Sequence, residues 1–531
     1  MAESAKGQSS GGLLRAGALV GATTLLSRVL GLVRDVVLAR VIGADALADA
    51  FFIAFRIPNF LRRLFAEGAF NQAFVPVLAE WRERGGQAAV RELIDRVAGA
   101  LGAVLSALTA AVVVAAPLVA LAFAPGFAAD PARHEALSGM LRWTFPYLWF
   151  ISLAGFAGAI LNSYDRFVVP AFTPVWLNLC LIAAALLGLA HLAEPAWALA
   201  VGVFCAGAVQ FCFQLPFLAR LDLLPRPRLD WRHPGVRRIL TLMAPALFGV
   251  SVSQVNLLFD TVIASFLPAG SVSWLYYSDR IAELPLGVIG VALGTVILPS
   301  LSRQHARNAA ADFARTVSWA MRLILLVALP AALALVLLAE PILATLFHDG
   351  VEITRRDVEM SAWSLRAYAL GLASFMAIKV LAPGFYARQD LKTPVTIGVV
   401  AMVANMVLNV AFVVPLHLLW QVGHAGLALA TSLAAALNAG LLYGRLKGQG
   451  LLARAPGRGR YWLRLALANL ALGGLLLAFR GEAASWYQWG AVERVVRLAA
   501  LCVAGVALYG AVLAALGMRP ADLRRGGSGG H

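Results

Sequence analysis

Charged side chains are scarce in this 531-residue sequence, and cysteine is scarcer still. Only 14% of the residues are charged and 60% are hydrophobic, whereas soluble domains have about 25% charged and about 45–50% apolar residues. So low a charge content excludes an ordinary soluble enzyme, which would expose large apolar surfaces to water. The sequence has four cysteines in apolar runs without metal-ligand spacing, and we expect small buried apolar side chains there. They are Cys180, Cys205, Cys212 and Cys502.

Several motifs that carry chemistry are also absent. The sequence has no phosphate-binding loop of the Walker type, which argues against direct use of ATP. No acidic pair and no Ser/His/Asp set lies at the mouth of an apolar stretch. His417 and His424 fall in a predicted outer loop without neighbouring carboxylates or cysteines, which argues against a metal site. The first apolar run is too long for a signal peptide and contains arginines.

Apolar stretches that could each span a bilayer, which takes about 20 residues, recur along the whole chain. They predict an all-α integral membrane protein with about fourteen transmembrane helices and no soluble domain of useful size. The stretches are 13–39, 47–79, 97–123, 137–161, 170–190, 196–219, 239–267, 271–301, 314–339, 358–385, 394–415, 424–444, 461–480 and 492–517.

The basic residues outnumber the acidic ones by 44 to 28, a formal charge of +16. Most of them lie in loops on the same predicted side as the N-terminus, and the positive-inside rule then places both termini in the cytoplasm. One such loop, 220–238, is basic enough to lie against anionic lipid headgroups. A nucleic-acid partner would need this charge on one soluble face, so none is expected.

The chain repeats itself weakly, with matching landmarks 223 or 224 residues apart. The repeat predicts two pseudo-symmetric six-helix lobes in the same orientation, followed by two C-terminal helices, and repeated halves are typical of secondary transporters. The matched pairs are Pro117 with Pro341, Pro170 with Pro394, Arg56 with Arg280, and Pro76 with Pro299.

These landmarks predict how the chain is divided. Residues 13–236 would form the N-lobe and residues 237–450 the C-lobe, with the final helix pair in 451–520. Residues 1–12 are polar and predicted to be disordered. Residues 521–531 form a tail that ends in GGSGGH, which is typical of a tag remnant.

Charged and polar side chains within the first two predicted spans of each half form a second pattern. Such residues are costly in lipid and usually line a pathway. Arg34, Arg56, Asp260 and Arg280 are expected at similar depth, with Arg28 nearer the midplane. Arginine binds phosphate through a planar, permanently charged fork, so these residues predict a water-filled cavity that binds an anion. The other members of the set are Ser27, Asp35, Asp49, Asn59, Arg62, Arg63, Glu67, Asp279 and Glu283.

A structural explanation of the same residues stays open at this stage. Asp35, Asp49 and Glu283 could simply neutralise the arginines as ion pairs. Arg63 and Glu67, together with Arg62, are expected nearer the cytoplasm, where they could form a network that closes an inner gate.

Long motifs in the sequence resemble the MurJ/MviN family of lipid II flippases, within the multidrug/oligosaccharidyl-lipid/polysaccharide exporter superfamily. The resemblance covers essentially the whole chain. It rests on SRVLGLVRD (27–35), DAFFIAFRIPNFLRRLFAEGAFNQAFVPVLAE (49–80), ILNSYDRFVVPAFTP (160–174), SVSWLYYSDRIAELPLGVIGVALGTVILPSLS (271–302) and KVLAPGFYARQDLKTPV (379–395).

The resemblance implies fourteen helices in two lobes, with the last pair forming a groove for a polyprenyl tail. It implies alternating-access transport of lipid II from the cytoplasmic to the periplasmic leaflet of the bacterial inner membrane, for cell wall synthesis. Asp260 departs from the family pattern, in which we expect an uncharged polar residue. The family's cavity arginines match Arg28, Arg34, Arg62 and Arg280; its other basic or polar positions match Arg56, Asp49, Glu67, Ser273 and Glu283.

Combining the two lines of reasoning gives two groups of candidate residues. The predicted substrate-binding group is Arg28, Arg34, Arg56, Arg62, Arg280, Ser27, Asn59 and Ser273. The predicted charge-network and gating group is Asp35, Asp49, Arg63, Glu67, Asp260, Asp279 and Glu283.

Three rival functions are weighed against this one. A multidrug or cation antiporter on the same scaffold would need a carboxylate-rich cavity. A membrane glycosyltransferase would need an acidic metal-binding motif and a polar domain. Only the motifs argue against a flippase for another polyprenyl-linked oligosaccharide. We expect a monomeric transporter, not an enzyme, without metal or cofactor, coupled to the membrane potential or to a monovalent cation; contacts with cell-wall synthesis proteins stay open.

Overall fold

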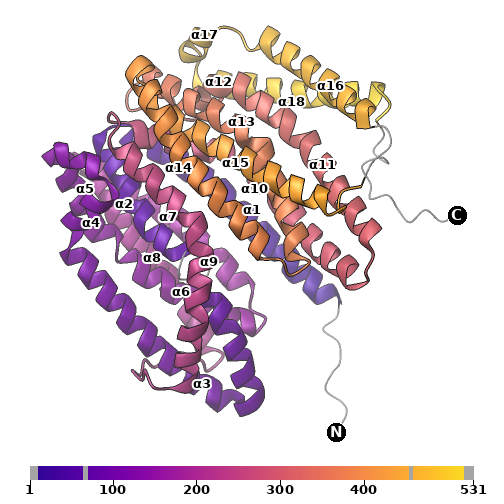
Figure 1. The fold of residues 1–531 in the computed structure, drawn as a ribbon. Coiled ribbons are helices and arrows are strands. Elements are labelled where there is room, and N and C mark those ends of the chain that lie inside the picture. Colours follow the sequence, from indigo (N-terminus) through magenta and orange to yellow (C-terminus); the bar gives the residue numbers. More distant parts are fainter. Residues whose placement is uncertain (1–9, 64–69, 454–457, 519–531) are drawn as a thin grey trace. The chain divides into compact units, whose positions relative to one another are not determined.

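The structure is a computed structural model that describes residues 10–63, 70–453 and 458–518, with side chains except at 10–18, 244–254, 288–296 and 458. Within these ranges every regular element is a helix (Figure 1). The helices are α1 (Ser10–Ile42), α2 (Ala46–Arg62), α3 (Phe70–Val114), α4 (Ala116–Phe123), η2 (Pro125–Ala129), α5 (Pro131–Thr144), α6 (Tyr147–Ser163), α7 (Val168–His191), α8 (Pro195–Ala219), α9 (Pro234–Ser265), α10 (Ser271–Ala306), α11 (Ala310–Leu337), α12 (Ala339–Leu346), α13 (Arg355–Tyr386), α14 (Lys392–Trp420), α15 (Gly423–Gly448), α16 (Arg458–Phe479), α17 (Ala483–Gln488) and α18 (Ala491–Ala515).

The predicted spans fall on these helices. Ten helices in the described part of the chain are long and apolar enough to cross a membrane; α5 and α6 are counted there as one. The other four predicted spans fall on α1, on α2 with the start of α3, on α9 and on α10. The prediction of an all-helical, multi-span membrane protein is confirmed.

Short polar residues and prolines fix where several helices begin. The Asp45 carboxylate accepts the backbone N–H of Ala48 at the start of α2, and Asp130 does the same at the start of α5. Thr354 and Asp357 form a reciprocal capping box on α13. Inside α3 the backbone turns at Gly86, whose φ of 65° suits a residue without a Cβ, so two helices meet there at a kink.

The chain divides into two compact units, one ending at Gly270 and the other beginning at Ser271. In the first unit α9 packs against α3, and a large apolar core joins α3, α6 and the start of α9. In the second unit α13 packs against α10, α11 and α15. The predicted lobes, which come from the repeat and not from packing, stay a prediction; residues 1–9 and 519–531 lie outside the described chain.

The internal repeat reappears in the backbone of the two units. Asp165 after α6 and Gln389 after α13 stand 224 residues apart and have φ values of 61° and 60°. In both turns the following residue donates its N–H to the carbonyl oxygen five positions back, at 2.9 and 3.1 Å. The breaks before α4 and α12, at Ala115 and Leu338, also match, with φ/ψ near −90/19° and −105/16°. Two helical halves therefore share the same turns at the predicted offset.

Two expectations from the sequence are wrong. Cys205, Cys212 and Cys502 are exposed rather than buried, on helices that a membrane would cover with lipid. Neither predicted loop histidine lies in a loop: His417 is in the last turn of α14, and His424 is buried at the start of α15, where it is 1% exposed. The cysteine error arises because apolar runs do not show which helix face packs inward, and the histidine error arises because hydropathy does not fix where a helix begins or ends.

Candidate substrate site

The predicted site residues of α1 form a buried network with α7. The Arg34 guanidinium donates to Asp35 Oδ1 from Nε and Nη2, at 2.9 and 2.6 Å, and to Asn178 Oδ1 from Nη1, at 3.0 Å. Asn178 in turn donates from Nδ2 to the carbonyl oxygen of Ser27 at 3.0 Å. Arg34 and Asp35 are 7% and 3% exposed. This arginine therefore pairs with Asp35, as the structural explanation predicts, and joins α1 to α7.

Arg28, on the same helix, has a different environment. Arg28 is exposed, and its side chain makes no hydrogen bond or ion pair with any of the described residues. An exposed guanidinium on a membrane helix keeps its full capacity to bind an anionic oxygen. Of the predicted arginines, Arg28 is thus the most available to a ligand.

Arg56 links α2 to α9 within the first unit. Its Nη1 donates to Thr261 Oγ1 at 3.0 Å, and the Thr261 hydroxyl donates to the carbonyl oxygen of Leu257. Arg56 and the neighbouring Asp260 are both half-buried. The structure therefore brings the predicted second and seventh spans together at the predicted arginine.

The inner part of α2 carries a second polar group. Arg62 Nε donates to Asn59 Oδ1 at 3.3 Å, while Asn59 Nδ2 donates to the carbonyl oxygen of Phe55. Arg63 is exposed and its backbone N–H caps the helix end. Glu67, the remaining member of the predicted inner network, lies outside the described residues.

Asp49 lies in a fully buried polar contact that ties together three parts of the first unit. Its Oδ2 accepts the backbone N–H of Gly270 at 2.8 Å and lies 3.6 Å from Nη2 of Arg133 on α5. Asp49 is 0% exposed, and the Arg133 guanidinium also covers the ring of Phe127 at 4.0 Å. The carboxylate therefore fixes α2 to α5 and to the end of the unit.

In the second unit the predicted residues cluster near the start of α10. Arg280 Nη1 donates to Glu283 Oε2 at 3.2 Å, and its guanidinium covers the Tyr276 ring at 4.9 Å. The side chains of Arg280 and Glu283 are 32% and 49% exposed, so water screens this pair. Ser273 is fully buried and Asp279 is half-buried. Arg280 therefore keeps an accessible guanidinium.

Sequence reasoning missed the partners that come from other helices. Asn178, Thr261 and Arg133 each contact a predicted residue more than 80 positions away. Asn178 is a polar residue in an apolar span, which is the one signal that could have identified it.

The second unit also holds a buried polar cluster that the sequence did not predict. His424 Nδ1 lies 2.7 Å from Ser364 Oγ, and the Trp274 ring packs against the imidazole at 5.0 Å. Trp274 Nε1 donates to Asp357 Oδ1 at 2.9 Å. No group of three or more His, Cys, Asp or Glu side chains in the described chain is arranged to hold a metal ion.

The last helix pair packs on α11. An apolar cluster of Leu326, Leu465, Ala468 and Leu513 joins α11, α16 and α18. In α17, between α16 and α18, burial raises the pKa of the Tyr487 phenol, and nearby Glu340 raises it further, so this side chain stays neutral.

Comparisons with known proteins identify the family of this chain. The family model "Lipid II flippase MurJ" matches residues 38–497. A Vibrio cholerae protein named "Probable lipid II flippase MurJ" is 50% identical over 519 residues, which cover 96% of this chain and 98% of that one. A Burkholderia cenocepacia protein named "Lipid II flippase MurJ" is 42% identical over 97% of this chain and 99% of its own.

Solved structures show the same fold. The structure described as "Lipid II flippase MurJ, inward closed conformation" has a TM-score of 0.77 at 24% identity, covering 93% of this chain and 98% of that one. An inward-facing multidrug resistance transporter of the MATE family and MOP superfamily has a TM-score of 0.66 at 13% identity, covering 82% and 98%. On the sequence matches, this chain belongs to the MurJ family.

Proposed function

We propose that this protein carries lipid II, the undecaprenyl-pyrophosphate-linked disaccharide-pentapeptide, from the cytoplasmic to the periplasmic leaflet of the bacterial inner membrane for cell wall synthesis. The observation that carries the proposal is the 50% identity, along almost the entire chain, to a relative named as a probable lipid II flippase. The protein acts as a transporter and performs no covalent chemistry.

The pyrophosphate is the part of lipid II that the arginines suit best. Arg28 is exposed, Arg56 is half-buried and donates to the neutral Thr261 hydroxyl, and the partners of the half-buried Arg62 and Arg280 include the neutral Asn59 amide and the solvent-screened Glu283. Exchange of such partners for a phosphate oxygen costs little, because a charged acceptor binds guanidinium more strongly than a neutral one. Arg34 is the least available of the five, since Nε, Nη1 and Nη2 all donate within the first unit.

Transport proceeds by alternating access of the two repeated halves, with both termini in the cytoplasm and one chain as the working unit. The polyprenyl tail stays in the bilayer or against α16 and α18. The energy for transport comes from the membrane potential, which contributes about 2.3 kcal/mol per charge per 100 mV, or from a gradient of a monovalent cation.

The test is flipping of labelled lipid II by the purified full-length protein in liposomes. Arg280→Glu should abolish flipping, because the new carboxylate repels the pyrophosphate and lies beside Glu283. Arg355→Glu is the matched control: it makes the same charge change at an exposed arginine that also pairs with a nearby glutamate, and it should flip normally.

Two results would contradict the proposal. Full flipping by Arg280→Glu would remove this arginine from the site. Wild-type protein that flips a different polyprenyl-linked glycan but not lipid II would overturn the substrate.

A further inference from the structure

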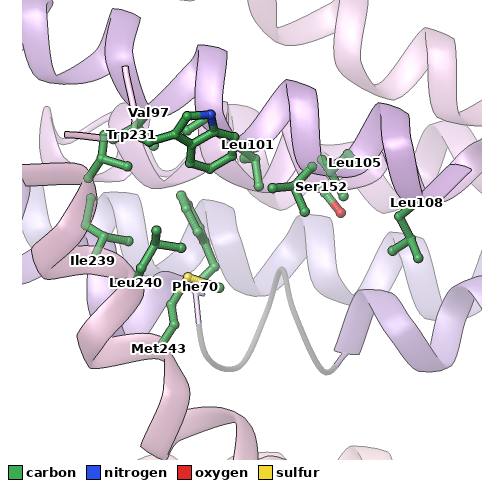
Figure 2. Close-up of a pocket in the computed structure, with 13 residues that line it drawn as sticks. Phe70, Val97, Leu101, Leu105, Leu108, Ser152, Trp231, Ile239, Leu240 and Met243 are labelled. Atoms are coloured by element: carbon green, nitrogen blue, oxygen red, sulfur yellow. The ribbon is translucent and has the colours of Figure 1, made fainter. Parts of the chain in front are cut away.

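An apolar cavity of about 270 Å³ lies in the first unit, apart from the predicted substrate residues. Its wall comes from α3, α6 and α9 and from Trp231, which precedes α9 (Figure 2). Twelve of the thirteen lining residues are apolar or aromatic, and the other is Ser152. Such a lining suits hydrocarbon and offers little to a polar ligand.

The cavity is elongated along α3. Figure 2 shows Val97 beside Trp231 at one end and Leu108 at the other, with Leu105 and Ser152 near Leu108. Leu108 stands eleven positions after Val97 in the helix, a rise of about 16 Å. Val104, which also lines the cavity, is 48% exposed, so one side opens to the surroundings of the helix. This shape fits a single extended hydrocarbon chain entering from the bilayer.

The segment at the Trp231 end is held firmly in place. The Asp95 carboxylate accepts the backbone N–H of Arg226 at 2.7 Å, and its carbonyl oxygen accepts that of Arg228 at 3.0 Å. Gly99 lies directly under Arg228: a Cβ at this position would be 2.3 Å from the Arg228 carbonyl oxygen. These contacts with α3 therefore fix the position of the segment at the rim of the cavity.

The same rim carries uncompensated positive charge. Nearby arginines are neutralised, since Arg96 pairs with Asp230 at 3.5 Å and Arg238 with Glu80 at 2.6 Å. Four others are exposed, and within the described chain their guanidinium groups make no hydrogen bond or ion pair. These four are Arg226, Arg228, Arg232 and Arg237.

Two of these arginines are placed to meet a headgroup. Arg232 follows Trp231, and Arg237 stands one turn before Leu240 on the same face of α9. Trp231 and Leu240 both line the cavity and are 43% and 46% exposed. A partly exposed tryptophan among arginines and leucines is typical of the headgroup level of a membrane.

We propose that this cavity is a binding site for an anionic glycerophospholipid, with one acyl chain along α3 and the phosphate between Arg232 and Arg237. The positive rim selects an anionic headgroup, and the apolar interior takes the chain. This site lies beyond the proposed transport function, since nothing in it requires lipid II.

The proposal is tested by binding of dioleoyl phosphatidylglycerol to delipidated full-length protein, followed by native mass spectrometry, with dioleoyl phosphatidylcholine as the zwitterionic comparison. The wild-type protein should bind one phosphatidylglycerol saturably and phosphatidylcholine much more weakly. The double variant Arg232→Gln/Arg237→Gln should lose about 30-fold in affinity for phosphatidylglycerol and no longer distinguish the two lipids. Its control is Arg303→Gln/Arg307→Gln, which removes two exposed arginines at the end of α10.

A second pair of variants tests the chain site. Val104→Trp fills the cavity from its exposed side and should weaken binding of phosphatidylglycerol at least tenfold. Val114→Trp, at an 81% exposed position of the same helix, should leave it unchanged. Equal losses in the two arginine pairs would mean non-specific charge attraction and overturn the proposal. Wild-type binding by a folded Val104→Trp protein would overturn it as well.

Discussion

Replacing Asp49 tests whether this predicted site residue has a structural role or a gating role. Its carboxylate is completely buried, accepts the N–H of Gly270 and faces Arg133, whose side chain is 13% exposed. Asp49→Asn keeps the shape of the side chain and can keep the Gly270 hydrogen bond, but it leaves the Arg133 charge without its carboxylate.

The size of the effect follows from burial and distance. Removing one partner of a buried ion pair costs about 3–5 kcal/mol, and the 3.6 Å separation places this pair near the lower end, about 3 kcal/mol. For a folding unit of roughly this size, that lowers the unfolding midpoint by about 6–12 °C. Asp49→Ala also removes the acceptor for Gly270 and costs about 1 kcal/mol more.

The assay is thermal unfolding of the purified protein in detergent, followed by tryptophan fluorescence, alongside flipping of lipid II in liposomes. Asp45→Ala is the matched control: it removes an exposed aspartate that caps the same helix and costs about 1 kcal/mol. Adding Arg133→Gln to Asp49→Asn should recover part of the lost stability, because the uncompensated charge disappears. An Asp49→Asn protein that unfolds like the wild type but does not flip would refute the structural role.

Three further predictions concern contacts within one unit. Asn178→Ala removes the acceptor of Arg34 Nη1 and should lower the free energy of unfolding by about 1–3 kcal/mol, measured by thermal unfolding; an unchanged midpoint contradicts it. Arg494→Met removes two hydrogen bonds to carbonyl oxygens at and just after the end of α12, so hydrogen exchange should rise there and not only in α18. Gly99→Ala sets a methyl group against the Arg228 backbone, so exchange should rise in residues 226–232, whereas Gly102→Ala, with open space at its Cβ, should not change it.

The helical content of the chain was predictable because a bilayer requires long apolar runs, and the described residues of each predicted span fall on one helix or on two consecutive helices. The positions at which the helices are interrupted were less predictable. The sequence shows Pro117 and Pro341, but the backbone leaves the helical region two and three residues earlier, at Ala115 and Leu338, so that α3 ends at Val114 and α11 at Leu337. The kink at Gly86 depends on a positive φ that many glycines could adopt, so composition alone does not select it.

The candidate site was predictable only where its contacts are local. Arg34 with Asp35, and Arg280 with Glu283, are neighbours along one helix, so the sequence alone identifies these carboxylates as candidate partners. Contacts between helices depend on how each helix is rotated about its axis, which hydropathy does not fix when apolar residues surround the helix on all sides. For that reason the contact between Arg133 and Asp49 was not predictable from the sequence.

The environment of Arg34 adds a mechanical consequence to the proposed transport cycle. A pyrophosphate that binds this arginine at Nη1 would displace Asn178, which also donates to the Ser27 carbonyl of α1. Because a ligand shifts an equilibrium only through its different affinities for two states, binding at Arg34 would favour states in which α1 has left α7. Binding at Arg28 requires no such separation, since its guanidinium has no partner in the described chain. Substrate contact at Arg28 followed by contact at Arg34 would therefore couple binding to movement of α1.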